Sequence, residues 1–137
     1  MSKAIEMSDI FPLMEKNIND TIKEIKAGNY RLGVEGIKEG KKEYYPRYVG
    51  RSDSDLKTEI IQRGLNDLTD KKTGKPLYTY FRFIYAKNAD EAYLNECNDY
   101  HHYMQSLDNK IHPAIPNGSN IKYPVDGCEY SAKPKGK

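Results

Sequence analysis

The stretch that decides the fold runs Tyr48-Val49-Gly50-Arg51-Ser52, followed by Asp53-Ser54-Asp55 and Leu56. A short apolar segment that closes on glycine is typical of a strand end, where Gly50 lets the backbone turn sharply. The polar residues at 53–55 are favoured N-caps, so a helix is predicted over residues 55–68. Its apolar side chains recur at helical spacing on one face, at Leu56, Ile60, Leu65 and Leu68.

Extended segments lie on both sides of this helix. Residues 30–37 and 44–49 flank a polar turn that contains glycine, which predicts an antiparallel hairpin. Pro46 has no N–H to donate, so the second strand of the hairpin is expected at a sheet edge or at a bulge. Residues 77–86 alternate aromatic with polar side chains and predict a third strand.

Two further segments have the apolar period of an amphipathic helix. One covers residues 9–27, with Ser8 or Asp9 as its cap, and its apolar face is made by Met14, Ile18, Ile22 and Ile25. The other covers residues 88–105, and its apolar stripe is made by Leu94, Cys97, His101 and Met104. The predicted fold class is α/β (α+β): a small three-stranded, mostly antiparallel sheet flanked by helices, with an extra N-terminal helix.

The length of 137 residues suits one compact domain. We divide it into an N-terminal helical segment at 1–29, a central domain at 30–105, and a Pro-, Gly- and Asn-rich extension and tail at 106–137. The net charge of +2 neither requires nor excludes nucleic acid as a partner. No run of about 18 apolar residues and no secretory signal is present, so we expect no membrane span, a cytoplasmic location and reduced thiols at Cys97 and Cys128.

The element order and three short motifs resemble the GIY-YIG nuclease superfamily. The motifs are Gly33-Val34-Glu35, Tyr48-Val49-Gly50-Arg51-Ser52 and Ala92-Tyr93-Leu94-Asn95-Glu96, and the resemblance covers residues 30–105. It implies a GIY-YIG-like fold and a metal-dependent endonuclease that hydrolyses phosphodiester bonds in DNA with Mg²⁺ or Mn²⁺. Because no separate DNA-binding domain is evident, specificity would come from a protein partner or a homodimer.

The resemblance also assigns site residues. Tyr48 matches the tyrosine that activates the attacking water, although a tyrosine with a pKa of about 10 needs nearby cations to act as a base. Glu96 matches the glutamate that binds the divalent cation, and a carboxylate oxygen suits Mg²⁺. Stabilising the phosphorane falls to Arg63 or Arg51, because the position of the family's arginine, at residues 58–59, carries no cation.

Two departures from the family pattern leave a second interpretation open. The arginine position is not cationic, and Glu35 stands where the first motif has tyrosine. Glu35 is either a carboxylate that approaches Tyr48 and the metal, or an outward-facing strand residue. The alternative to a nuclease is therefore a catalytically inactive GIY-YIG-like module that binds nucleic acid or a protein partner.

Three weaker signals remain. Asn117 or Asn120 matches the family's late asparagine, although Asn beside Gly is also a common turn. Lys and Arg at positions 71, 72, 75 and 82 form a phosphate-binding rim with Arg51 or an ordinary solvated surface. His101, His102 and His112 are expected to be structural, because His101 and His102 point to different helix faces and no Cys or His pair has ligand spacing.

Overall fold

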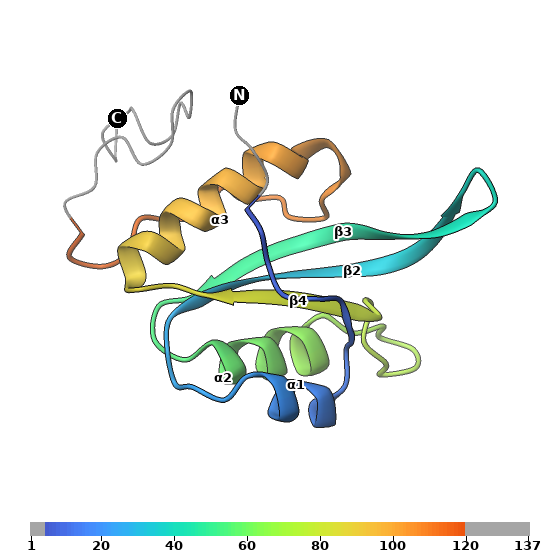
Figure 1. Ribbon diagram of the computed structural model, residues 1–137, viewed down its shortest axis with the longest axis horizontal. Helices are drawn as coiled ribbons and strands as arrows, with labels where there is room; N and C mark the ends of the chain where they lie inside the picture. Colours follow the sequence, from blue (N-terminus) through green and yellow to red (C-terminus); the bar gives the residue numbers. More distant parts are fainter. Residues whose placement is uncertain (1–4, 120–137) are drawn as a thin grey trace.

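The computed structural model describes residues 5–119 of the chain, and Figure 1 shows how its elements are arranged. An antiparallel sheet lies between helices, with α3 on one side and with α1 and α2 on the other. Among the described residues, no helix has both the length and the apolar character that crossing a membrane requires. In chain order the elements are β1 (Phe11–Pro12), α1 (Glu15–Thr21), β2 (Gly28–Lys38), β3 (Lys41–Ser52), α2 (Leu56–Ile60), the π-helix η1 (Ile61–Asp67), β4 (Tyr80–Tyr85), α3 (Ala89–Tyr103) and the 3₁₀ turn η2 (Met104–Ser106).

The sheet has four strands in the order β1-β4-β2-β3, so its antiparallel character is confirmed, and a fourth strand, β1, joins the three that were predicted. The additional strand, β1, has only two residues and therefore no alternation that a sequence pattern can show. It forms because the edge of β4 needs hydrogen-bond partners. The amide of Ser8 donates to the carbonyl of Phe83, and the amide of Leu13 donates to the carbonyl of Thr79, each over 2.8 Å.

The N-terminal helix is much shorter than the predicted range of residues 9–27. Helix α1 covers only Glu15–Thr21, because the residues before it extend along β4. The predicted cap, Ser8, instead accepts a hydrogen bond from the amide of Phe83. Two of the four predicted apolar positions, Ile18 and Ile22, are fully buried, whereas Met14, the residue before the helix, and Ile25, which lies beyond it, are exposed.

Strands β2 and β3 form the predicted hairpin, which projects from the body of the domain as an arm (Figure 1). The register shifts within the hairpin, so that Arg47 is an extra residue between Pro46 and Tyr48. Strand β3 is also the last strand of the sheet. Both parts of the expectation for Pro46 are confirmed, because a residue without an N–H is accommodated at a bulge on an edge strand.

The two faces of the sheet differ in chemistry, because the side chains of β2 alternate in direction. Tyr30 and Leu32 belong to the main hydrophobic core with α1 and α2, which is completed by Leu13, Ile18, Ile22, Leu56, Ile60, Tyr78, Phe81 and Phe83. Asn29 and Arg31 are buried as well, and they bind side-chain and backbone groups of α3. The interface between helix α3 and the sheet is therefore partly polar.

The remaining predicted elements are present with changed details. The helix expected at 55–68 begins with Asp55 as its cap, as predicted, and widens after Ile60 into the π-helix η1. Strand β4 and helix α3 lie inside the predicted ranges of 77–86 and 88–105. The apolar stripe predicted for α3 is only partly correct, because Cys97 is buried but Met104 is 48% exposed.

A buried ion pair joins β2 to α3. Arg31 donates from Nε and Nη2 to the two carboxylate oxygens of Asp99, over 3.0 and 2.9 Å, and both side chains are at most 2% exposed. The same guanidinium donates to the carbonyl of Ile5 over 2.7 Å and lies 5.2 Å from the ring centroid of Tyr103. Each charge is tolerated in the interior because its partner is present.

Removing one partner of this pair should destabilise the protein severely. In Asp99→Ala the guanidinium of Arg31 stays buried without its counter-charge, so the free energy of unfolding should fall by about 3–5 kcal/mol in chemical denaturation. The double variant Arg31→Met/Asp99→Leu should recover most of this loss, because no charge then remains buried.

The matched control is Asp20→Ala, which breaks the exposed ion pair between Lys16 and Asp20 on α1. Exposed pairs contribute little to stability, so its denaturation midpoint should equal that of the wild type. Equal midpoints for Asp99→Ala and Asp20→Ala would show that the buried pair does not hold the fold together.

Candidate functional site

Tyr48 lies half-buried on β3 and packs against the core on the α2 side of the sheet. Its ring stands between those of Tyr30 and Tyr78, with centroid distances of 6.4 and 6.3 Å. Burial raises the pKa of Tyr48; the charge of Arg63 opposes this rise, and the carboxylate of Glu96 adds to it. The pKa is thus not lowered by cations, and the hydroxyl stays protonated at neutral pH. Such a group suits the orientation of a water molecule and not its deprotonation.

Gly50 is required for a reason other than the predicted sharp turn. Strand β3 continues through Gly50 to Ser52. A Cβ atom at Gly50 would collide with the ring of Tyr30, which lies across the strand. Tyr30 is fully buried, and its hydroxyl donates to Glu59 over 3.0 Å. The glycine therefore makes room for a second tyrosine beside Tyr48, and the sequence motifs did not identify that residue.

Arg63 lies on η1, on the same side of the sheet as Tyr48, and its side chain is 41% exposed. Its guanidinium is 3.8 Å from Glu59 and 3.4 Å from Asp67. Exposed pairs of this kind are weak, so the guanidinium can exchange them for a phosphate group. Burial raises the pKa of both Tyr48 and Tyr30, and the charge of Arg63 opposes this rise at each of them.

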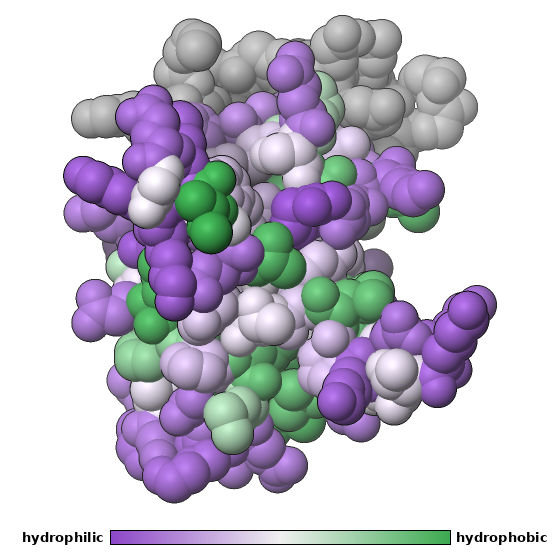
Figure 2. Space-filling view, turned by 90° about the vertical axis from the view of Figure 1, so that its right-hand side faces the viewer, coloured by the Kyte–Doolittle hydropathy of each residue, from purple (hydrophilic) through white to green (hydrophobic). Residues whose placement is uncertain are grey.

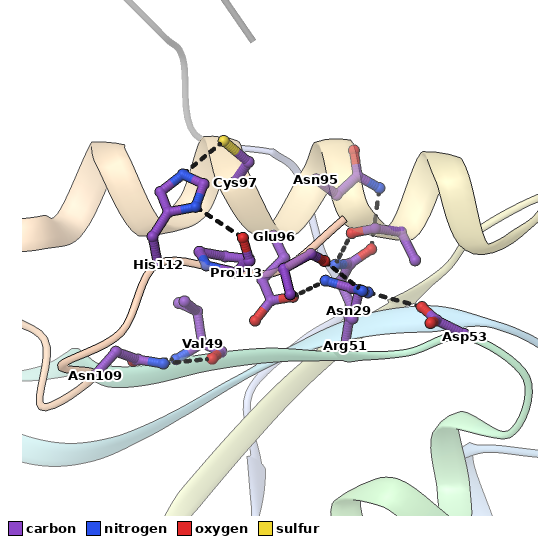
Figure 3. A network of polar contacts seen from close by, with 12 residues as sticks. Asn29, Val49, Arg51, Asp53, Asn95, Glu96, Cys97, Asn109, His112 and Pro113 are labelled. Carbon is purple, nitrogen blue, oxygen red and sulfur yellow. Dashed lines mark hydrogen bonds and ion pairs between the residues drawn. The ribbon is translucent and has the colours of Figure 1, made fainter. Parts of the chain in front are cut away.

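Glu96 and Arg51 form an ion pair between α3 and β3 (Figure 3). Nη1 of Arg51 donates to Oε1 of Glu96 over 2.7 Å, and the two side chains are 13% and 14% exposed. Nε of Arg51 donates to Asp53, and Nη2 donates to the carbonyl of Ala114, each over 2.7 Å. All three guanidinium nitrogens are engaged, so Arg51 holds Glu96 in place and is not the cation available to a phosphorane.

Tyr48 and Glu96 belong to opposite faces of the sheet, because Tyr48 packs with the core on the α2 side and Glu96 lies on α3. Glu96 contributes to the raised pKa of Tyr48, and Glu59 contributes to the raised pKa of Glu96. Tyr48 is therefore influenced by the charges of both Arg63 on η1 and Glu96 on α3.

Glu35 does not join this group. It is exposed, and it pairs with Tyr44 in the hairpin. Since successive residues of a strand alternate in direction, Glu35 points away from the face of Leu32, which is the partner of Tyr48. The structure places Glu35 outside the site, as an outward-facing strand residue.

Residues 107–116, here called the C-terminal strap, run along the edge of β3. The amide of Asp108 donates to the carbonyl of Arg47 over 2.6 Å. The side chain of Asn109 binds both backbone groups of Val49, each over 2.9 Å (Figure 3). Asn109 thus takes the place of a further strand at this edge. It is a second residue near the site that the sequence motifs did not identify.

The weaker sequence signals lie away from the site or outside the described residues. Asn117 is exposed in a turn, and Asn120 lies outside the described part of the chain. The basic residues of the loop at 71–75 are exposed. Arg82 is on β4, where it donates to the carbonyl of Ser8, and β2 separates it from Arg51. Arg82 and Arg51 therefore do not form a common rim.

A group of metal-ligand side chains lies next to Glu96 in the sequence. Cys97, His101 and His112 bring their ligand atoms within 4.8 Å of one another. The prediction that no Cys or His pair has ligand spacing is wrong, because Cys97 and His101 are four residues apart on one face of α3. That spacing was the available signal. His112 comes from the strap, and its place beside α3 follows only from the tertiary fold.

The raised pKa of Glu96 predicts how stability depends on pH. Burial raises it from 4.5 to about 7, although Arg51 acts against this rise. A carboxyl group that binds its proton more tightly when folded stabilises the fold below pH 4.5, and this contribution is lost as the pH rises through about 7. Between these pH values the wild type should therefore lose stability relative to Glu96→Gln in chemical denaturation. If the stabilities of the two proteins changed in parallel with pH, the charge of Arg51 would outweigh the effect of burial on the pKa of Glu96.

Comparisons with known proteins identify no family for this chain. No protein-family model, no curated protein and no solved structure matches the chain. The resemblance to GIY-YIG nucleases therefore rests on the motifs around Gly50 and Glu96 and on the order of the elements. What the structure contributes independently is the position of Tyr48 on β3, where the charges of Arg63 on η1 and Glu96 on α3 both influence its pKa.

Proposed function

We propose that this chain is a metal-dependent endonuclease of the GIY-YIG type that hydrolyses phosphodiester bonds in DNA. The proposal is carried by Tyr48, whose pKa is influenced by the charges of both Arg63 and Glu96. Each residue comes from the element that carries its counterpart in the resembled superfamily: the second hairpin strand, the helical segment after it, and the last helix. The order hairpin, helix, strand, helix supports the same assignment.

In this proposal each side chain has the role that its chemistry suits. The protonated hydroxyl of Tyr48 orients the attacking water by hydrogen bonds, because both donor and acceptor are present in a phenol. Arg63 contacts the non-bridging phosphate oxygens, since a guanidinium matches their geometry and its charge counters the charge that develops there. Arg51 and Asp53 hold the carboxylate of Glu96 in one orientation.

The surroundings of Glu96 fit a Mg²⁺ or Mn²⁺ ion. Arg51 donates to Oε1, so the second carboxylate oxygen, Oε2, is the atom that would bind the ion. Mg²⁺ sites are commonly built from one or two carboxylates together with waters and substrate phosphates, and a single Glu is sufficient for that arrangement. When bound, the ion supplies charge stabilisation at the phosphate and lowers the pKa of a bound water.

A catalytically inactive binding module is the second candidate, and a specific observation favours it. The carboxylate of Glu96 is already paired with Arg51, which satisfies it without a metal. Hydrophobic residues also gather near the middle of the face shown in Figure 2, as in surfaces that bind proteins. A module of this kind would bind nucleic acid or a protein partner without cleaving DNA.

The test is cleavage of labelled duplex, branched and single-stranded DNA with Mg²⁺ or Mn²⁺. Glu96→Gln should abolish cleavage and keep the fold, because the amide oxygen of Gln still accepts from Arg51. Tyr48→Phe should slow cleavage by roughly 100-fold, because it removes the group that orients the water. Circular dichroism checks that both variants are folded.

Tyr44→Phe is the matched control for Tyr48→Phe. Tyr44 lies on the same strand, and its buried hydroxyl has no hydrogen-bond partner among the described residues. Removing that hydroxyl should leave cleavage unchanged. Full activity of Glu96→Gln would remove this residue from the mechanism, and a folded wild type that binds DNA without cleaving it would establish the second candidate.

A further inference from the structure

We propose that Cys97, His101 and His112 form a Zn²⁺ site, separate from the oxygen site proposed at Glu96. The three side chains bring their ligand atoms within 4.8 Å of one another. Sγ of Cys97 lies 3.3 Å from Nε2 of His112, so two of the ligand atoms are already in contact (Figure 3). The described part of the molecule has no other group of three such ligands at this separation.

The separation of these two atoms is the one that a tetrahedral zinc ion requires. Zinc binds cysteine sulfur at about 2.3 Å and histidine nitrogen at about 2.0 Å, and a tetrahedral angle then puts the two ligand atoms roughly 3.5 Å apart. The distance of 3.3 Å between Cys97 and His112 agrees with this value. The ligand atoms all lie within 4.8 Å of one another, so those that are farther apart than this pair must close in on the ion when it binds.

The three ligands come from two segments of the chain, helix α3 and the C-terminal strap. Cys97 and His101 are separated by one helical turn of α3, and side chains at this spacing lie on the same helix face. His112 belongs to the C-terminal strap, which is hydrogen-bonded to the edge of β3 through Asn109. The strap thus brings the third ligand to a pair that α3 already holds.

The protonation state of His112 is suited to binding a metal. Its Nδ1 lies 2.7 Å from the carbonyl oxygen of Pro113 (Figure 3). A carbonyl oxygen can only accept, so Nδ1 is the nitrogen that carries the proton, and the neutral ring has its lone pair on Nε2, the atom that faces Cys97. Such a backbone contact commonly fixes the tautomer and the orientation of a metal-binding histidine.

Aromatic packing orients the histidine rings further. The ring of Tyr100 packs edge-on against those of His101 and His112, with centroid distances of 5.5 and 5.3 Å. The two histidine rings lie 5.1 Å apart. A site whose ligands are held by packing loses less conformational entropy when the ion binds.

The ligand types select zinc over magnesium. A thiolate and two imidazoles are soft and borderline ligands that suit Zn²⁺, whereas Mg²⁺ takes oxygen ligands. Binding converts the Cys97 thiol to a thiolate, and its proton leaves to solvent. Three protein ligands leave the fourth tetrahedral position to a water molecule or to another small ligand.

The ion would fasten the strap to α3. The strap contributes the carbonyl of Ala114 to Arg51 and the side chain of Asn109 to Val49. Both contacts are made to β3, the strand that also carries Tyr48. Zinc therefore acts on the position of Arg51 through the strap. The carboxylate of Glu96 is not a ligand of this zinc ion.

Titration of the metal-free full chain with Co²⁺ and then Zn²⁺ tests the site, because a Co²⁺–thiolate bond absorbs visibly. The wild type should bind one equivalent, show thiolate charge-transfer absorption, and lose it when Zn²⁺ displaces Co²⁺. Cys97→Ser should lose the charge-transfer band. His112→Gln should weaken Zn²⁺ binding by more than the roughly 10–100-fold that losing an outer-shell partner costs.

Two variants serve as matched controls. Cys128→Ser removes the other cysteine of the chain, and His102→Gln removes an exposed histidine next to His101. Both should bind Co²⁺ as the wild type does. Retention of the band in Cys97→Ser, its loss in Cys128→Ser, or an absence of stoichiometric binding by the wild type would overturn the proposal.

A second measurement does not depend on whether a ligand variant folds. In the Cys128→Ser protein, the rate at which iodoacetamide alkylates Cys97 reports directly on this thiol. Cys97 is buried, so iodoacetamide reaches it through transient openings of the fold. Zn²⁺ should slow the reaction, because it holds the site closed and because a coordinated thiolate is a poorer nucleophile than a free one. An unchanged rate at saturating Zn²⁺ would show that the thiol does not bind the ion.

Discussion

The buried ion pair between Arg31 and Asp99 is the interaction on which the position of α3 depends. Its two hydrogen bonds and its charges have no substitute in the interior, so α3 cannot rotate on the sheet without breaking them. Asn29 adds a hydrogen bond of 2.8 Å to the carbonyl of Ala92. These polar residues of β2 hold the sheet-facing side of α3 in one orientation, and Glu96 on that helix then meets Arg51 on the neighbouring strand β3.

The same orientation brings two chemically different clusters to one edge of the sheet. Glu96 offers oxygen ligands beside Arg51, whereas Cys97 and His101 offer sulfur and nitrogen toward the strap. Adjacent residues of a helix point in different directions, so the two clusters do not compete for one ion. The edge of β3 is also where the strap replaces a further strand, which explains why so many polar contacts gather there.

Much of the fold was predictable because it depends on local rules. The hairpin, the bulge near Pro46 and the Asp55 cap follow from properties of single residues or short periods. Strand β1 and the short helix α1 could not be predicted in this way, because they form in response to the edge of β4, which is a long-range contact. Tyr48 and Glu96 were identified from motifs, whereas the pairing of Arg51 with Glu96, the ring of Tyr30 over Gly50 and the approach of His112 to Cys97 depend on tertiary structure.

The most direct test is a crystal structure of Tyr48→Phe with a short DNA duplex and Mn²⁺, whose anomalous scattering locates the ion. The account predicts an ion about 2.1 Å from a carboxylate oxygen of Glu96, a distance usual for such hard cations. It also predicts a backbone phosphate between this ion and Arg63, at the edge of β3. An ion bound away from Glu96, or DNA bound on another surface, would contradict it.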